Sequence, residues 1–176
     1  SDRLIGIKGT RGVGKTTFLL QYAKEKFGTD RSCLFINMNN FYFSGHSIVD
    51  FANEFQKRGG KVLLIDQVFK HPEWSKELRM CYDRYPNLKI VFTGSSVMRL
   101  KEENLELRDI AKSYNLRGFS FREFLNLQTG MKFRAYSLEE ILSTHEQIAK
   151  GVLSKVRPLD YFQDYLHHGF YPFFLE

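Results

Sequence analysis

Short apolar stretches alternate with longer amphipathic ones along most of the chain. Five of the short stretches have the length and composition of β-strands, at residues 4–7, 33–36, 62–65, 88–92 and 113–116. The amphipathic stretches between them have helical length, which is the connection that parallel strands require. The pattern therefore predicts an α/β fold, a three-layer sandwich in which helices cover both faces of a five-stranded, mainly parallel sheet.

Towards its end the chain becomes helical. Ser120 with Glu123, and Ser137 with Glu140, have the spacing of capping boxes at helix starts. A further helical segment is expected next to Pro158. We expect a core at residues 1–130 and a helical extension at 131–176, as two subregions of one protein. The last residues, GFYPFFLE, are strongly apolar, so we expect the tail to pack back or to continue into a longer protein.

Length and composition indicate an ordinary globular protein. The 176 residues suit one domain, and 43% of them are hydrophobic and 26% charged. No apolar run approaches the roughly 18 to 20 residues that span a bilayer, and no charged-then-apolar leader precedes the first strand, so we expect a cytoplasmic protein without membrane partners. Cys33 and Cys81 lack metal-ligand spacing and are interpreted as reduced thiols.

The net charge of +6 comes from 26 basic and 20 acidic residues. It would help the protein approach polyanions, but the basic residues are dispersed and form no dense tract. A solvated basic surface beside a phosphate site is therefore favoured over a dedicated nucleic-acid surface. In the same way, adjacent His167 and His168 point in different directions on a helix, so we interpret them as surface residues near a helix end rather than metal ligands.

The sequence GTRGVGKTT follows the first strand and opens a helix. It contains the G-x-x-x-x-G-K-[ST] pattern of a phosphate-binding loop, in the strand–loop–helix setting that supports this interpretation. Its glycines let successive backbone N–H groups point at phosphate oxygens, Lys15 would reach the β- and γ-phosphates, and Thr16 would bind Mg²⁺. The predicted nucleotide-binding residues are Gly9, Thr10, Arg11, Gly12, Val13, Gly14, Lys15, Thr16 and Thr17.

A second candidate element is the strand VLLID, which ends in Asp66. A carboxylate at this edge of a parallel sheet suits a magnesium site shared with Thr16. A whole strand lies in sequence between the phosphate loop and this one, which leaves room for the extra central strand of ATPases that use a catalytic glutamate. The sequence is unlike that of a GTPase, because it has neither the Asp-x-x-Gly motif after the Asp66 strand nor the base-reading motif Asn-Lys-x-Asp.

With these motifs in place, the chain resembles the prokaryotic AAA+ superfamily ATPases of the archaeal and bacterial predicted type, as found in Bacteroides-like bacteria. The resemblance extends from GTRGVGKTT through LIDQVFKHPEWSKELRMCYDRYPNLKIVFTGSS and LRGFSFREFL to YLHHGFYPFFLE. It implies a P-loop NTPase core with ATP and Mg²⁺ as cofactors. It also implies a longer parent protein, with a helical lid and further C-terminal domains, that forms a homo-oligomer.

The resemblance also implies roles for individual residues. IVFTGSS is similar to the strand whose end holds a γ-phosphate sensor, which makes Ser95 the first choice and Thr93 the second. A hydroxyl that caps the next helix is the alternative for Ser95. In such ATPases a neighbouring subunit supplies an arginine, and Arg108 and Arg117 lie in the corresponding part of the chain.

The sequence departs from the family at Gln67, where most relatives have glutamate after the aspartate. A neutral amide can orient water but has almost no basicity, so we expect Mg·ATP binding with slow hydrolysis. Gln67 is engineered, or it marks a natural slow switch, or another carboxylate such as Glu73 replaces it; the last is disfavoured because Glu73 lies at a helix start. Two functions remain open: an ATPase core coupled to conformational change, and a non-hydrolysing nucleotide-dependent interaction module, which could be associated with DNA.

Overall fold

The computed structural model describes residues 2–95 and 104–172, apart from the side chain of Ser95. The chain divides into two compact units, Ser1–Arg117 and Gly118–Glu176. No helix in the described ranges is both long and apolar enough to span a lipid bilayer.

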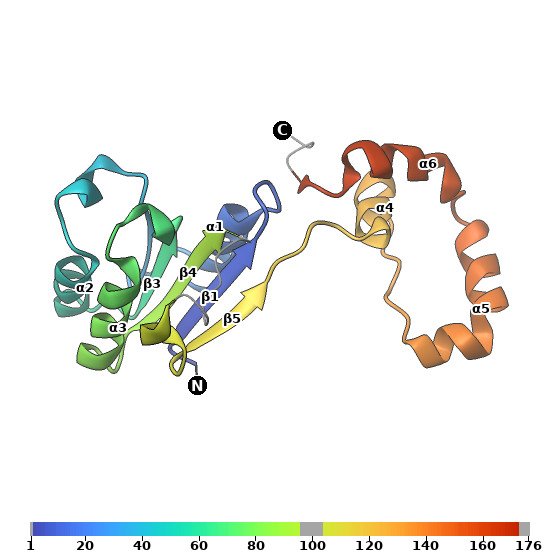
Figure 1. Ribbon diagram of the computed structural model, residues 1–176. Coiled ribbons are helices and arrows are strands. Elements are labelled where there is room, and N and C mark those ends of the chain that lie inside the picture. Colours follow the sequence, from blue (N-terminus) through green and yellow to red (C-terminus); the bar gives the residue numbers. More distant parts are fainter. Residues whose placement is uncertain (1, 96–103, 173–176) are drawn as a thin grey trace. The chain divides into compact units, whose positions relative to one another are not determined.

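A five-stranded sheet is the centre of the first unit (Figure 1). Its strands are β1 (Leu4–Gly9), β2 (Cys33–Asn37), β3 (Val62–Asp66), β4 (Lys89–Ser95) and β5 (Ala111–Asn115). They lie in the order β2-β3-β4-β1-β5, and each of the four ladders between neighbours is parallel. The predicted sheet is thus confirmed. The extra central strand, between β1 and β3, is β4, whereas β2, which lies between them in sequence, is at the edge.

Helices cover both faces of this sheet, as the sequence predicts. They are α1 (Lys15–Lys26), α2 (Ile48–Lys57) and α3 (Trp74–Arg84), and the short 3₁₀ turns are η1 (Phe41–Ser44), η2 (Val68–Lys70) and η3 (Leu105–Leu107). Side chains alternate along a strand, so successive residues of β3 belong to opposite faces. Leu63 and Ile65 pack with α2 and α3, whereas Val62 and Leu64 pack with Leu19 of α1.

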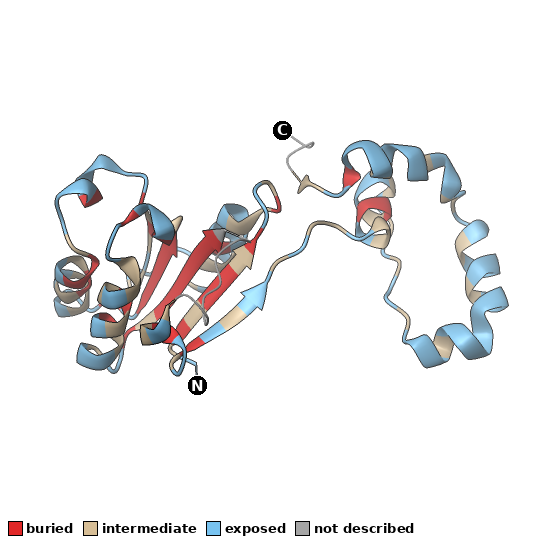
Figure 2. Ribbon diagram, in the orientation of Figure 1, coloured by how far each residue is buried: buried red, intermediate tan, exposed pale blue. Residues whose placement is uncertain are grey.

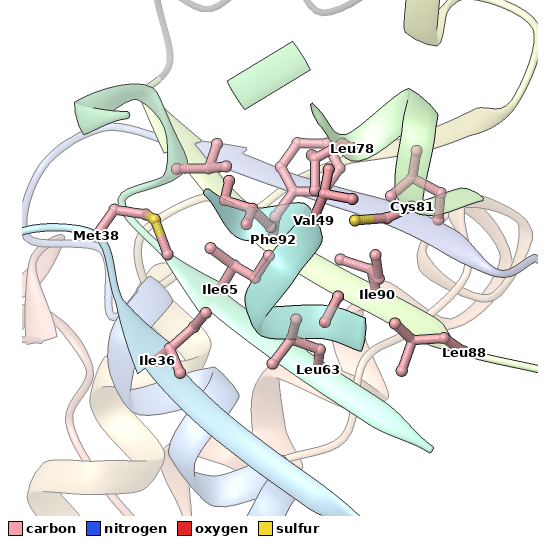
Figure 3. Close-up of a cluster of buried hydrophobic side chains, with 14 of the residues drawn as sticks. Ile36, Met38, Val49, Leu63, Ile65, Leu78, Cys81, Leu88, Ile90 and Phe92 are labelled. Atoms are coloured by element: carbon pink, nitrogen blue, oxygen red, sulfur yellow. The ribbon is translucent and has the colours of Figure 1, made fainter. Parts of the chain in front are cut away.

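The larger core lies between the sheet and helices α2 and α3. Figure 3 shows Leu63, Ile65, Ile90 and Phe92 of the central strands facing side chains from these helices, including the thiol of Cys81. Burial raises the pKa of this thiol to about 12, so it is an inert apolar packing group. The buried residues concentrate on the central strands, while β5 is largely exposed (Figure 2).

The second unit is helical. It contains α4 (Phe121–Thr129), α5 (Leu138–Leu153), α6 (Leu159–Asp164) and a π-helical turn, η4 (Tyr165–Gly169). Both predicted capping boxes are present, at the starts of α4 and α5. Non-helical backbone at Thr144 kinks α5.

Aromatic packing places α4 with this second unit. The ring of Phe121 lies 5.1 Å from that of Phe162 and 5.3 Å from that of Tyr165, between ring centroids. Gly169 passes so close to Phe124 that an added Cβ would be 2.7 Å from its ring. The compact units therefore divide before α4, earlier in the chain than the boundary after residue 130 that the sequence suggested, because α4 buries its aromatic face against later helices.

Candidate functional site

The predicted phosphate-binding loop, residues 9–17, connects β1 to α1 and is called the phosphate loop below. Gly12 and Gly14 have φ of 87° and 88°, a left-handed backbone that glycine adopts without strain. Gly14 precedes α1; within the described residues no side chain caps this helix, and its first turn contains no acidic residue. The first N–H groups of α1 are thus not satisfied by capping side chains, and with the positive end of the helix dipole they form an environment suited to an anion.

Gly9, the last residue of β1, is confined by neighbouring backbone. A Cβ at this position would clash with the carbonyl oxygen of Leu116 and would lie 3.0 Å from Cγ2 of Val13. Leu116 is fixed there because its N–H donates to the carbonyl of Lys8 at 2.7 Å. Only glycine fits at the start of the loop, so the close approach of these segments explains the residue type.

Lys15 folds back onto its own loop. Its Nζ donates to the carbonyl oxygens of Gly9 and Thr10, at 2.7 Å each. Partial burial lowers the pKa of the Lys15 ammonium, and the nearby charge of Asp66 acts in the opposite direction. The lysine is therefore a partly desolvated cation whose hydrogen-bond partners are neutral carbonyls.

Asp66 is the centre of a polar cluster at the carboxyl edge of the sheet, and it is only 1% exposed. Its Oδ2 accepts from Thr16 Oγ1 at 2.8 Å and from Asn37 Nδ2 at 3.1 Å, and its Oδ1 accepts from Thr93 Oγ1 at 2.5 Å. A buried carboxylate needs such partners to offset its lost hydration. These bonds bring together the start of α1 and the ends of β2, β3 and β4.

Gln67 follows Asp66 with an unusual backbone. At φ 54° and ψ 44° it is left-handed, alone among the non-glycine residues that the structure describes. Its N–H donates to Thr93 Oγ1 at 3.0 Å, so one hydroxyl binds both Asp66 and Gln67. For a non-glycine residue, this conformation is strained by about 1–3 kcal/mol, and it persists only where surrounding contacts impose it.

The other predicted residues are distributed as follows. Val13 is buried beneath the loop, while Thr10, Arg11 and Thr17 are exposed. Ser95 is the final residue of β4 and pairs with Gly9, but its side chain lies outside the described part, so Thr93 is the hydroxyl that the structure places in the cluster.

Three residues suggested for catalysis lie elsewhere on the surface of the first unit. Arg108 and Arg117 are exposed. Glu73, the alternative carboxylate, forms an exposed ion pair of 2.7 Å with Lys76, which lowers the pKa of the Glu73 carboxyl. The described contacts of Glu73 therefore give no support to a role in place of Gln67.

Asn37 was not among the residues predicted from the sequence. Besides its bond to Asp66, its Oδ1 accepts the N–H of Asn39 at 2.8 Å. The backbone supports the same contact, because Met38 N–H donates to the carbonyl of Asp66 at 2.9 Å. The available signal was a polar residue ending an apolar strand, the same arrangement that singled out Asp66.

The AAA domain family matches residues 1–125, which include the phosphate loop and the Asp66 cluster. Among solved structures, that of PCH-2 from C. elegans is 19% identical with a TM-score of 0.49, and the match covers 74% of this chain and 39% of that one. A search of curated proteins finds none that matches. Since the domain family spans well over half of the sequence, the chain belongs to the AAA domain family and contains a nucleotide-binding core of the ATPase type.

Proposed function

We propose that this core binds ATP together with Mg²⁺ through residues 9–17 and Asp66, and that it hydrolyses ATP slowly. The main support is the hydrogen bond of 2.8 Å between Thr16 Oγ1 and Asp66 Oδ2. These two residues are 50 positions apart in sequence, and the fold brings the phosphate loop and the end of β3 into contact. If Asp66 only capped the following helical turn, or if residues 9–17 were only a glycine-rich turn, this pairing would not be required.

The donor set fits magnesium. Mg²⁺ prefers oxygen ligands and retains several waters, and it is usually bound through one or two carboxylates plus substrate phosphates. The Thr16 hydroxyl and the Asp66 carboxylate supply oxygens of this type. Bound there, the ion would neutralise charge on the phosphate oxygens. We therefore assign Thr16 and Asp66 as the residues that hold it.

The loop fits the triphosphate. Left-handed Gly12 and Gly14 lead into the uncapped start of α1, and both features favour an anion. Lys15 now donates to two neutral carbonyls, and a phosphate oxygen is a stronger partner for its ammonium because the resulting hydrogen bond joins opposite charges. Binding would draw Lys15 from the loop carbonyls to the phosphates.

Slow hydrolysis follows from Gln67. The position after Asp66 is where a general base would take a proton from the attacking water, and an amide cannot do so. Loss of a general base removes about 10²–10⁴ of the rate. Nucleotide binding does not depend on that proton transfer, so we expect binding to persist.

A second function is favoured by the same residue. If Gln67 belongs to the native protein, the core acts as a nucleotide-dependent switch whose bound state outlasts any hydrolysis. Exposed Arg108 and Arg117 are available to a neighbouring copy, and either could supply the positive charge that an isolated core lacks. In that case turnover would also require self-association.

Single-turnover hydrolysis of Mg·ATP separates these functions. The unchanged chain is compared with Gln67→Glu, and Gln56→Glu on α2 is the matched control for the added charge. For an ATPase core we expect Gln67→Glu to cleave at least about 10²-fold faster, with nucleotide affinity unchanged. Equal binding without cleavage in all three proteins would favour the switch, and failure of all three to bind would reject the nucleotide site.

A further inference from the structure

The turn that begins at Gln67 is held at its other end by a buried histidine. Lys70 N–H donates to the carbonyl of Gln67 at 3.0 Å, and His71 N–H donates to that of Val68 at 3.1 Å. His71 is 9% exposed, and its carbonyl accepts the N–H of Trp74, which starts α3, at 3.3 Å. A continuous hydrogen-bonded segment thus joins Gln67 to α3, and it buries the apolar side chain of Val68 and the polar side chain of His71.

His71 contacts one carboxylate. Its Nε2 lies 3.0 Å from Oε1 of Glu77, and the two side chains are 10% and 15% exposed. A carboxylate only accepts hydrogen bonds, so this contact requires the hydrogen on Nε2. Nδ1 is buried and has no hydrogen-bond partner among the described residues. The Nε2 contact is therefore the polar interaction that fixes the ring.

Glu77 links this pair to a third element. Its Oε2 accepts the N–H of Ile48, the first residue of α2, at 2.5 Å. That N–H has no partner within its own helix, and a negative charge at a helix start is favourable. One carboxylate on α3 therefore joins the end of the Gln67 turn to the start of α2.

We infer that His71 and Glu77 are positioning residues that hold the Gln67 turn in its left-handed conformation; this inference rests on the proposed nucleotide site. A strained residue keeps its conformation only where contacts on both sides impose it. Thr93 binds the N–H of Gln67 on one side, and the His71–Glu77 pair fixes the other end of the turn to two helices. Together they set where the side chain of residue 67 lies relative to Asp66.

Two substitutions of His71 distinguish the effect of its polar contact with Glu77 from the effect of its ring packing. The amide nitrogen of glutamine can occupy the place of Nε2, so His71→Gln can keep the contact with Glu77. Phenylalanine retains the ring volume but cannot donate, so His71→Phe breaks it. His145→Phe, at an exposed histidine of α5, is the control for the substitution itself.

Amide hydrogen exchange of the full chain, with and without Mg·ATP, is the measurement. Without nucleotide we expect residues 67–74 to exchange about tenfold faster in His71→Phe but to remain near the unchanged rate in His71→Gln and His145→Phe. With Mg·ATP we expect protection of residues 67–74 in the unchanged chain and in His71→Gln, and its loss in His71→Phe. Affinity for the nucleotide should stay within about threefold.

Other outcomes overturn the inference. Equal exchange of residues 67–74 in all variants would mean that the pair does not hold the turn, and equal acceleration in His71→Gln and His71→Phe would mean that only ring packing matters. If His71→Phe does not fold, His71→Asn replaces it, because its shorter amide cannot reach Glu77. Absence of protection at residues 9–17 would reject the proposed nucleotide site, whereas the comparison without nucleotide still decides the role of His71.

Discussion

The hydroxyl of Thr93 donates to the carboxylate of Asp66 at 2.5 Å, and both residues are only 1% exposed. The same hydroxyl accepts the N–H of Gln67 at 3.0 Å. The side chain of Thr93 on β4 therefore satisfies the buried charge of Asp66 and also holds Gln67, the next residue after Asp66. This relationship connects the stability of the fold to the geometry of the candidate site.

Thr93→Val should destabilise the protein without a large change in volume. It leaves Asp66 Oδ1 without its donor and the Gln67 N–H without its acceptor, and each unsatisfied buried group costs about 1–3 kcal/mol. Because two groups lose their partner, urea denaturation should show a loss of unfolding free energy of about 2–6 kcal/mol. Thr29→Val, at an exposed turn, should stay within about 0.5 kcal/mol of the unchanged chain, and a similar value for both variants would contradict the assignment.

The backbone at Gln67 predicts an inverted preference between glycine and alanine. At φ 54° alanine is strained and glycine is not, so Gln67→Gly should be more stable than Gln67→Ala by about 1 kcal/mol. At Gln21, an exposed position within α1, the order should reverse by about 1 kcal/mol. Thermal or urea denaturation of the four variants tests this, and greater stability of alanine than glycine at both positions would show that the turn is not left-handed in solution.

Gly9→Ala should disturb the phosphate loop. An added Cβ would clash with the carbonyl oxygen of Leu116, and backbone cannot move aside as a flexible side chain can. We expect a destabilisation of about 1–3 kcal/mol and at least tenfold weaker binding of Mg·ATP in a titration. Gly45→Ala is the matched control, because a Cβ added at Gly45 would meet nothing within 4 Å. Equal affinities would mean that the loop tolerates displacement.

Glu140 predicts a pH effect at the start of α5. Hydrogen bonds from Arg134 and from the N–H of Ser137 lower the pKa of its carboxyl to about 2. A carboxyl with a depressed folded-state pKa stabilises the fold above its unfolded pKa, and this contribution is lost as pH falls from about 4.5 to about 2. NMR titration should find this low pKa, and Arg134→Gln should raise it. An ordinary pKa in the unchanged chain would contradict the contact.

Much of the fold is predictable from apolar patterning, because the central strands are short, buried and bounded by turn residues. The sheet and the capping boxes at Ser120 and Ser137 follow from such local rules. The position of β4 between β1 and β3 does not, since strand order depends on contacts distant in sequence. The same holds for α4, whose capping box predicts a helix start but not its packing against Phe162 and Tyr165.

The candidate site is predictable where a motif fixes spacing along the chain, as at Lys15, Thr16 and Asp66. Asn37 is not predictable in this way, because an asparagine after a strand commonly marks a turn, and its contact with Asp66 exists only once β2 pairs with β3. The left-handed backbone of Gln67 was also not apparent, since glutamine is not a typical residue for that conformation.

In the proposed function, this chain binds ATP through its phosphate loop and Asp66. Calorimetric titration with Mg·ATP tests it most directly, with the unchanged chain beside Lys15→Met and with ATP lacking Mg²⁺. We predict saturable binding to the unchanged chain. Lys15→Met should bind at least about tenfold more weakly, because a charge-assisted contact is lost. Binding should also be weaker without Mg²⁺. Absence of saturable binding, or equal affinity in the Lys15→Met variant, would contradict the account.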